Sequence, residues 1–316
     1  MPLKTIFMGT PDFAVPSLRA LHSDPRVDVC LVVSQPDKRS GRGNKLRATP
    51  VKAAAMELEI PTFQPDTLRT PEAIERLQQE GADLFVVAAY GQILRKSLLE
   101  TPRLGCVNVH ASLLPRWRGA APIHRAIAAG DAVTGVSIMR MERGLDTGPV
   151  YQMATVMIGD TETAGELHDR LGTLGADLLV ECLPVIESDD FIPTPQPTTR
   201  TTYAKMLGAE DKTLSFEGKA ENVVARINGM SPAPGARTSL AGEVVTVMKA
   251  RVSSVEESGP PGQVLAASMK AGLHVAAGEG AVEFLELKRP GKRAMSAQDC
   301  LNGMTIEPGE LCIAVE

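Results

Sequence analysis

The amino-terminal part of the chain alternates short apolar segments with helical patterns, and this alternation restricts the fold more than any other feature of the sequence. Buried strands are predicted at residues 4–8, 27–34, 82–89, 105–110 and 134–141. Helices are predicted at residues 11–22, 49–58, 71–80, 120–129 and 163–186. Strands that alternate with helices form a parallel sheet, because each helix serves as the crossover to the next strand. We therefore expect an α/β fold with a Rossmann-like, doubly wound parallel sheet.

The turn after the first strand reads Gly9-Thr10-Pro11-Asp12. We expect Thr10 to cap the following helix and Pro11 to occupy its first position. No GxGxxG string follows this strand, and the string from Gly41 to Lys45 lacks the spacing of a P-loop. The sequence therefore predicts no dinucleotide site despite the Rossmann-like pattern.

The composition changes after about residue 188. Three prolines (Pro193, Pro195 and Pro197) and several threonines in residues 188–202 are typical of an extended connector. A predicted helix at residues 220–228 follows. Short strands with glycine turns are then predicted at residues 237–240, 243–251, 262–267, 272–277 and 281–287. Five such strands indicate a small β-barrel. We expect a first domain at residues 1–189, a linker at residues 190–207 and a second, smaller domain at residues 208–316.

Length and composition are those of an ordinary globular protein. A chain of 316 residues allows two domains, and 43% hydrophobic residues with a mean hydropathy of −0.02 exclude a disordered chain. No apolar run reaches the roughly 18 residues that span a bilayer, and the amino terminus lacks the pattern of a signal peptide. We expect a cytoplasmic protein with no membrane contact. The five cysteines and five histidines show no metal-ligand spacing, so we expect no metal and read the cysteines as buried free thiols.

A formal net charge of −5 argues against a protein that coats nucleic acid nonspecifically. Two basic clusters nevertheless stand out against this acidic background. The first is Lys38, Arg39, Arg42, Lys45 and Arg47, and the second is Lys288, Arg289, Lys292 and Arg293. Each cluster alone is typical of a solvated surface loop. Together they also fit a local surface that contacts phosphates.

A polar pair ends one of the predicted strands. Asn108 and His110 are two residues apart, so their side chains project from the same face at the strand's carboxyl end. Ligands of open α/β sheets bind at this edge. An amide beside an imidazole suits chemistry at a carbonyl group, because one holds the oxygen while the other stabilises charge or moves a proton.

Asp146 lies in a turn between Gly144 and Gly148, after the strand predicted at residues 134–141. A turn aspartate commonly caps its own backbone. Asp146 is also placed to reach the imidazole of His110, hold its orientation and favour its protonated form. Arg118, near by in the sequence, is suited to pair with a carboxylate or with a phosphate, and the sequence does not decide between them. Trp117 is expected to serve packing.

The run VNVHASLLPRWRGAAPIHRAI, which begins at Val107, resembles the signature of the folate-dependent formyltransferases. Its WRGAAP part is similar to the branch of that family that acts on methionyl-tRNA. Further similar strings occur in family order: FMGTPDFA at residues 7–14, QPD at 35–37, GRG at 41–43, AYG at 89–91, GLDTG at 144–148 and KRAMSAQD at 292–299. Together they cover nearly the whole chain.

The resemblance implies a Rossmann-like catalytic domain and a carboxyl-terminal OB-like β-barrel that binds tRNA. It implies that Asn108, His110 and Asp146 catalyse transfer of a formyl group from 10-formyltetrahydrofolate to the α-amine of methionine on initiator methionyl-tRNA, for translation initiation. Ser112, Leu113, Leu114 and Pro115 match its folate-contacting stretch. Tyr90 and Gln92 are expected to line the same pocket, although Tyr90 equally suits core packing. The basic loop at residues 38–47 matches the loop that meets the tRNA acceptor arm. We expect a monomer.

The chain departs from the family pattern at several positions. Ala111 follows His110 where many relatives have glycine, and Ala233 stands where an NPWPG-type string has tryptophan. Residues 214–216 read Leu-Ser-Phe in place of an IDW-like string. None of these departures touches Asn108, His110 or Asp146.

Three other functions remain open at this point. A formyltransferase acting on an amino sugar nucleotide shares the HxSLLP core, but its relatives usually lack WRGAAP and a comparable basic loop. A hydrolase that releases formate from the folate would use the same three side chains, with water replacing the amine. A noncatalytic RNA-binding module would not need Asn108, His110 and Asp146 together.

Overall fold

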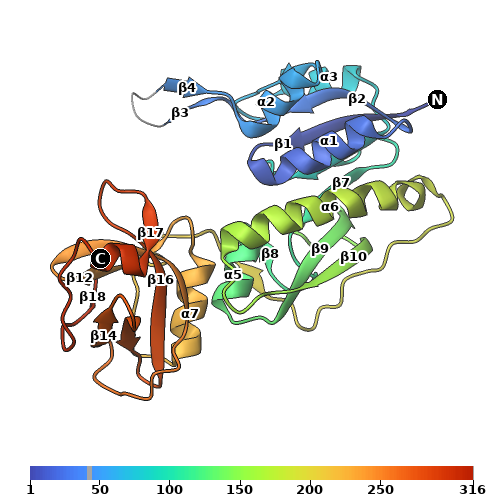
Figure 1. Cartoon of the computed structure of the whole chain (residues 1–316). Helices are drawn as coiled ribbons and strands as arrows, with labels where there is room; N and C mark the ends of the chain where they lie inside the picture. The colour runs from blue at the N-terminus through green and yellow to red at the C-terminus, as the bar shows by residue number, and fades with distance from the viewer. Residues whose placement is uncertain (41–44, 316) are drawn as a thin grey trace. The chain divides into compact units, whose positions relative to one another are not determined.

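The computed structural model describes residues 1–40 and 45–315, and the chain forms two compact units (Figure 1). The first unit comprises Met1–Gly119, Gly135–Val156 and His168–Tyr203. The second comprises Ala120–Thr134, Met157–Leu167 and Ala204–Glu316. The segments at residues 120–134 and 157–167 thus pack with the carboxyl-terminal part of the chain. The domain boundaries expected at residues 189 and 208 remain a prediction.

A seven-stranded sheet with the order β10-β9-β7-β6-β1-β2-β5 forms the centre of the first unit. Its strands are β1 (Leu3–Gly9), β2 (Val27–Val33), β5 (Thr62–Phe63), β6 (Leu84–Ala88), β7 (Cys106–His110), β9 (Val133–Arg140) and β10 (Val150–Met157). The pairs from β7 through β6, β1 and β2 to β5 are parallel, which confirms the Rossmann-like sheet. Strand β9 runs antiparallel to β7. The sequence pattern missed β10, because most of its side chains keep contact with solvent and no apolar run marks it.

Four of the six α-helices described up to residue 187 have a proline at their first or second position. The six helices are α1 (Val15–Ser23), α2 (Pro50–Glu57), α3 (Pro71–Gln79), α4 (Lys96–Leu99), α5 (Pro122–Ala128) and α6 (Ala164–Glu187). Thr49 caps α2 by accepting a hydrogen bond from Lys52 N, and Thr70 caps α3 by accepting one from Ala73 N. On α6, a Cβ at Gly175 would lie 2.8 Å from Cγ1 of Val109, so this helix approaches β7 closely.

The cap expected at Thr10 is wrong. A short 3-10 helix, Asp12–Ala14, follows the turn, and α1 begins only at Val15. The Thr10 hydroxyl instead donates to the carbonyl of Tyr90 at 2.9 Å and accepts from Gln35 N at 3.3 Å. Thr10 therefore ties together three loops at the carboxyl ends of β1, β2 and β6.

Two short strands, β3 (Lys38–Ser40) and β4 (Lys45–Arg47), form an antiparallel hairpin. Its register places Lys38 opposite Arg47 and Arg39 opposite Leu46. The side chains of all four residues are exposed. Arg42, which the sequence placed in the same basic cluster, lies outside the described residues.

An antiparallel sheet with the order β14-β15-β16-β13-β12-β18 dominates the second unit. Its strands are β12 (Ala236–Leu240), β13 (Glu243–Val252), β14 (Val264–Ser268), β15 (Gly272–Ala276), β16 (Ala281–Lys288) and β18 (Ile313–Ala314), with β17 (Ala294–Ser296) paired to β16. The five predicted strands are β12 to β16. A bridge between Gln263 and Leu311 and a hydrogen bond from Val264 N to Glu310 O link the two ends of the sheet. The sheet thus curls into the expected OB-like barrel.

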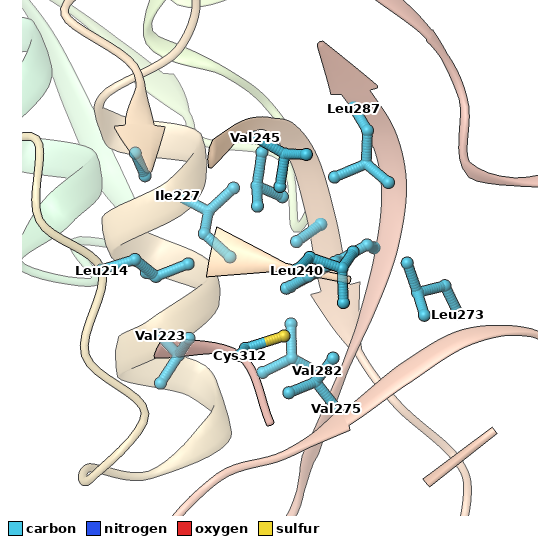
Figure 2. Close-up of a cluster of buried hydrophobic side chains, with 14 of the residues drawn as sticks. Leu214, Val223, Ile227, Leu240, Val245, Leu273, Val275, Val282, Leu287 and Cys312 are labelled. Carbon is cyan, nitrogen blue, oxygen red and sulfur yellow. The ribbon is translucent and has the colours of Figure 1, made fainter. Parts of the chain in front are cut away.

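Helix α7 (Ala220–Gly229) supplies the barrel with an apolar face. Val223 and Ile227 pack with strand residues such as Leu240 and Val282 in one buried cluster (Figure 2). Residues 214–216, where the sequence departs from the IDW-like string of the family, also belong to this core, because Leu214 and Phe216 are buried in the cluster. Helix α5 packs against the other side of α7, where a Cβ at Gly229 would lie 2.8 Å from the nitrogen of Ala128. A last short helix, α8 (Ala297–Leu301), follows β17.

Throughout residues 1–40 and 45–315, no helix has both the length and the apolar character needed to cross a bilayer. All five cysteines carry free thiols, and four of them are buried.

Candidate active site

Strand β7 places Asn108 and His110 at the carboxyl edge of the central sheet. Asn108 is half-buried and lies opposite Val87 of β6 and Met139 of β9. His110 is 5% exposed and lies opposite Ser137. The two-residue spacing puts both side chains on one face of the sheet, as the sequence predicted.

The hydrogen bonds of His110 define which ring nitrogen faces the site. Nε2 lies 3.0 Å from the carbonyl oxygen of Trp117. A carbonyl oxygen only accepts, so Nε2 carries a proton and donates it. Nδ1 therefore remains for other partners, and it lies 3.8 Å from Oδ2 of Asp146.

Asp146 projects from the loop between β9 and β10 toward the rest of the site. Its carboxylate accepts a 2.7 Å hydrogen bond from the backbone nitrogen of Gly119. This contact joins the β9–β10 loop to the short strand β8 (Arg118–Gly119), which favours the functional interpretation of Asp146 over that of a turn aspartate that caps its own backbone. Its φ of +50° lies in the left-handed region, which aspartate tolerates better than most residues. Gly148, two residues after Asp146, has no room for a side chain, because a Cβ there would lie 1.9 Å from the carbonyl oxygen of Arg140.

The turn after β7 is held by hydroxyl groups. Ser112 is fully buried, and its hydroxyl donates to the carbonyl of Arg116 at 2.6 Å. Ser137 donates to the carbonyl of Ser112 at 2.7 Å and accepts from Leu114 N at 3.2 Å. The Ser112 hydroxyl shapes the turn and is not a free nucleophile. Burial also raises the pKa of the Cys106 thiol to about 12, so this neighbouring thiol stays protonated at neutral pH.

Tyr90 and Gln92 are placed less favourably for ligand contact than the sequence predicted. Tyr90 is 2% exposed and belongs to a buried hydrophobic cluster with Leu94 and Leu98. Burial raises the pKa of its phenol, and its hydroxyl makes no hydrogen bond within the described part of the chain. The Gln92 amide accepts from Leu68 N at 2.9 Å and contacts the carbonyls of residues 65 and 66. The Gln92 side chain thus holds a neighbouring loop.

Arg118 has a partner that the sequence did not indicate. Its side chain is buried, and Nε and Nη2 donate to Oε1 of Gln196 at 2.9 and 2.6 Å. The expected partner was a carboxylate or a phosphate. Gln196 lies in the predicted connector, and only its long polar side chain among prolines marks it in the sequence.

A cavity of about 270 Å³ lies beside this connector. It is lined by Leu114, by residues 150–153 of β10 and by residues 194–197. Of the predicted folate-contacting residues, its lining includes Leu114, whereas Asn108, His110 and Asp146 lie outside that lining. In the described ranges no group of three or more His, Cys, Asp or Glu residues is arranged to hold a metal ion.

Two family models match the chain and together cover most of it. The model described as formyl transferase matches residues 3–183, and the model described as formyl transferase, C-terminal domain, matches residues 206–305. A methionyl-tRNA formyltransferase of Methylococcus capsulatus is 46% identical over 95% of this chain and 96% of its own length. One of Xylella fastidiosa is 48% identical over 95% of this chain and 97% of its own length. The chain belongs to the methionyl-tRNA formyltransferase family.

Solved structures share the fold of this formyltransferase. HypX from Aquifex aeolicus, solved in complex with tetrahydrofolic acid, matches 100% of this chain with a TM-score of 0.63 and 17% identity, and this chain spans 51% of HypX. The N-formyltransferase from Helicobacter canadensis, solved with folinic acid and dTDP-3-aminofucose, matches 90% of this chain and 99% of its own, with a TM-score of 0.67 and 16% identity. Identities this low show the fold alone.

The side chains of the two basic clusters of this formyltransferase differ in their exposure to solvent and in their bonds to other protein groups. Lys45 and Arg47 are exposed on the β3–β4 hairpin. In the second cluster Lys288, Lys292 and Arg293 are exposed as well. Arg289 is instead bound to the Glu243 carboxylate, with 2.7 Å between Nη2 and Oε1, and to the carbonyl of Gly303. Arg289 is thus the member least available to a phosphate.

Proposed function

We propose that this chain transfers the formyl group of 10-formyltetrahydrofolate to the α-amine of methionine on initiator methionyl-tRNA, for translation initiation. The full-length similarity to methionyl-tRNA formyltransferases carries this proposal. Asn108, His110 and Asp146 supply a site of matching chemistry. An amide, an imidazole and a carboxylate at the carboxyl edge of a parallel sheet suit acyl transfer to an amine.

The reaction begins with attack of the neutral amine on the formyl carbon. A tetrahedral intermediate with an oxyanion forms, and Asn108 and His110 hydrogen-bond this oxygen. Because Nε2 of His110 is committed to Trp117 O, Nδ1 is the nitrogen that faces substrate. The bond between the formyl carbon and the folate nitrogen then breaks, and the folate nitrogen leaves as an amine. The new bond between the formyl carbon and the methionine nitrogen remains. No covalent enzyme intermediate is needed.

Asp146 serves the proton balance of this reaction. One proton leaves the attacking amine, and one is returned to the folate nitrogen. The carboxylate is 3.8 Å from Nδ1 of His110, close enough to stabilise positive charge on the imidazole in the transition state. It accepts the proton of the amine directly or through water.

The β3–β4 hairpin is the proposed contact for acceptor-stem phosphates. Its register places Lys38 directly opposite Arg47, and Lys45 occupies the same face of the ribbon two residues along. Like charges directly opposite one another destabilise a hairpin. A polyanion that binds this face relieves the repulsion. Arg39, on the other face, and Arg42, outside the described residues, complete the basic cluster.

The second unit is proposed to add tRNA affinity through Lys288, Lys292 and Arg293. A barrel with a positive face commonly follows a nucleic-acid backbone. For the folate, Ser112, Leu113, Leu114 and Pro115 remain the proposed contacts through the backbone and apolar groups of their turn. Tyr90 and Gln92 would act by holding the neighbouring loops. We propose a monomer that works in the cytoplasm.

A single assay tests the proposed function. Purified enzyme is given 10-formyltetrahydrofolate with methionyl initiator tRNA, with a dTDP-linked amino sugar, or with neither. Formylmethionyl-tRNA formed only in the first reaction supports the proposal. Formylated sugar would indicate the amino-sugar reaction, and tRNA-independent release of formate would indicate a folate hydrolase.

A further inference from the structure

The connector, residues 188–202, does more than join two parts of the chain. Thr194 pairs with Val150 of β10 through two backbone hydrogen bonds of 2.8 and 2.9 Å. Farther along, Oγ1 of Thr202 accepts from Trp117 N at 2.9 Å. The carbonyl of Trp117 in turn binds His110. The connector is therefore attached at two points, Thr194 and Thr202, to backbone beside the candidate active site.

Between these two attachments lies Gln196, whose side-chain amide makes all four hydrogen bonds that it can make. Nε2 donates to the carbonyl of Asp146 at 2.8 Å and to that of Gly148 at 2.7 Å. Oε1 accepts from Nε and Nη2 of Arg118. A primary amide has two N–H donors and an oxygen with two lone pairs. All four are engaged, so the orientation of the amide is fixed by its partners.

The loop between β9 and β10, which Gln196 contacts, needs contacts from outside the loop to keep its conformation. Asp146 has a left-handed backbone conformation, with φ +50°. Such a conformation persists in a non-glycine residue when its surroundings determine it. One restraint is the bond from Gly119 N to the Asp146 carboxylate, and the other is the pair of bonds from Gln196 to the loop carbonyls. Arg118 and Gly119 are consecutive, so the contacts close a ring from Gln196 through Arg118 and Gly119 to Asp146.

We propose that Gln196 is a positioning residue for formyl transfer, which acts by fixing the loop that carries the Asp146 carboxylate beside His110. This inference rests on the role of Asp146 in the proposed function. Gln196 itself makes its four hydrogen bonds to protein groups. Its loss displaces the carboxylate without removing any group that reacts. A displacement of about 1 Å in a catalytic group can lower turnover by about a hundredfold.

Two substitutions test the hydrogen bonds of the Gln196 amide, one by removing all of them and one by removing only the donors. Gln196→Met keeps the length of the side chain and removes all four hydrogen bonds. Gln196→Glu keeps an acceptor for Arg118 but replaces the donor with an oxygen that faces two carbonyl oxygens. We expect each variant to lower kcat by about tenfold to a hundredfold while the KM for the folate stays near the parent value. Gln78→Met, at an exposed position of α3, is the matched control and should keep the parent kcat.

A double-variant comparison tests whether Gln196 acts through Asp146. Once Asp146→Asn has removed the carboxylate, adding Gln196→Met should cost little more, because residues that act as one unit are not additive. Losses that multiply would overturn the inference, as would parental kcat in either single variant. Circular dichroism and thermal melting verify that each variant is folded, and if Gln196→Met does not fold, Gln196→Glu carries the same comparison.

Failure of the inference is distinguishable from failure of the proposed function. If the parent enzyme does not formylate methionyl-tRNA, the function is wrong. If Asp146→Asn keeps the parental rate, the role of Asp146 and that of Gln196 fall together. If Asp146→Asn is slow and Gln196→Met is fast, only the role of Gln196 is wrong.

Discussion

The imidazole of His110 and the carboxylate of Asp146 face each other at 3.8 Å, which is too long for a hydrogen bond between them. Each group is held in place by another contact, His110 by Trp117 O and Asp146 by Gly119 N. Distances between catalytic groups are commonly longer in a free enzyme than in its complex with substrate. The separation leaves Nδ1 accessible to the oxygen of a bound formyl group.

We expect His110→Ala and Asn108→Ala each to lower kcat by about a hundredfold or more, because each removes one donor to the oxyanion. Binding of methionyl-tRNA should change far less, since neither side chain belongs to the basic clusters. The measurements are initial rates at saturating folate and equilibrium binding of tRNA. Near-normal turnover of the His110 variant would exclude this role.

Lys45→Ala and Arg47→Ala test the β3–β4 hairpin. Each lost phosphate contact should raise the KM for tRNA and reduce the slope of log affinity against log salt concentration by about one unit. Arg103→Ala is the control, because Nε of this arginine is 2.7 Å from the Asp83 carboxylate and the pair is already neutral. If both hairpin variants match the parent in KM and salt slope, the hairpin is only a solvated surface.

The periodicity of the sequence was sufficient to predict most of the central sheet and the first five barrel strands. Buried parallel strands such as β6 are continuous apolar runs, and Pro50 and Pro71 mark helix starts. Strand β10 was missed because most of its residues touch solvent and follow no strict alternation. Thr10 was misassigned because its partners, Tyr90 O and Gln35 N, come from other loops. Local propensity carries no information about such partners.

The same limit applies to the candidate site. Asn108 and His110 follow from a two-residue period, and Asp146 from glycines around it. The role of Gln196 was not predictable, because its partner Asp146 is 50 residues away and their contact depends on how β10 and the connector pair. Arg118 was expected to bind a charged group, yet its buried guanidinium binds the neutral amide of Gln196.

Gly148→Ala should damage the site through the backbone. The added Cβ would lie 1.9 Å from Arg140 O, a backbone atom that cannot move aside easily. The loop must shift, and Asp146 shifts with it, so we expect lower kcat and a lower melting temperature. Gly159→Ala is a control of the same chemistry, since its Cβ would make only an ordinary 3.5 Å contact with Glu162 Cβ. Equal effects of the two substitutions would contradict the steric explanation.

Asp211 gives the second unit a pH-dependent contribution to stability. Burial raises the pKa of this carboxyl, but hydrogen bonds from Arg125 and Gly208 N outweigh that effect and lower the pKa overall. A lowered pKa means that the stabilisation is complete above the unfolded value of about 3.9 and is lost as the pH falls through the folded pKa. Asp211→Asn should therefore destabilise the protein at pH 7, and its difference from the parent should shrink below about pH 4.

The expected loss at pH 7 is about 3 kcal/mol, at the low end of values for broken buried ion pairs. The low end applies because the Arg125 and Arg226 side chains keep 20% and 29% exposure. Urea unfolding of the whole chain at pH 7 and at pH 3.5 measures both differences. Glu279→Gln, which removes an exposed pair with Lys219, should change stability by less than about 1 kcal/mol at either pH. A difference for Asp211→Asn that does not depend on pH would contradict the assignment.

Two shortened chains test whether the connector is passive. Both lack the carboxyl-terminal barrel. A chain ending at Asp189 also loses the Thr194–Val150 pair and the Gln196 and Thr202 contacts, whereas a chain ending at Tyr203 keeps them. Each such hydrogen bond contributes about 1 kcal/mol net, and 1 kcal/mol shifts the melting temperature of a chain of this size by about 2–4 °C. Ordering of the connector opposes part of this gain. We therefore expect the longer chain to melt several degrees higher and to bind a folate analogue more tightly. Equal melting temperatures would mean that residues 190–203 are the simple linker that their composition indicates.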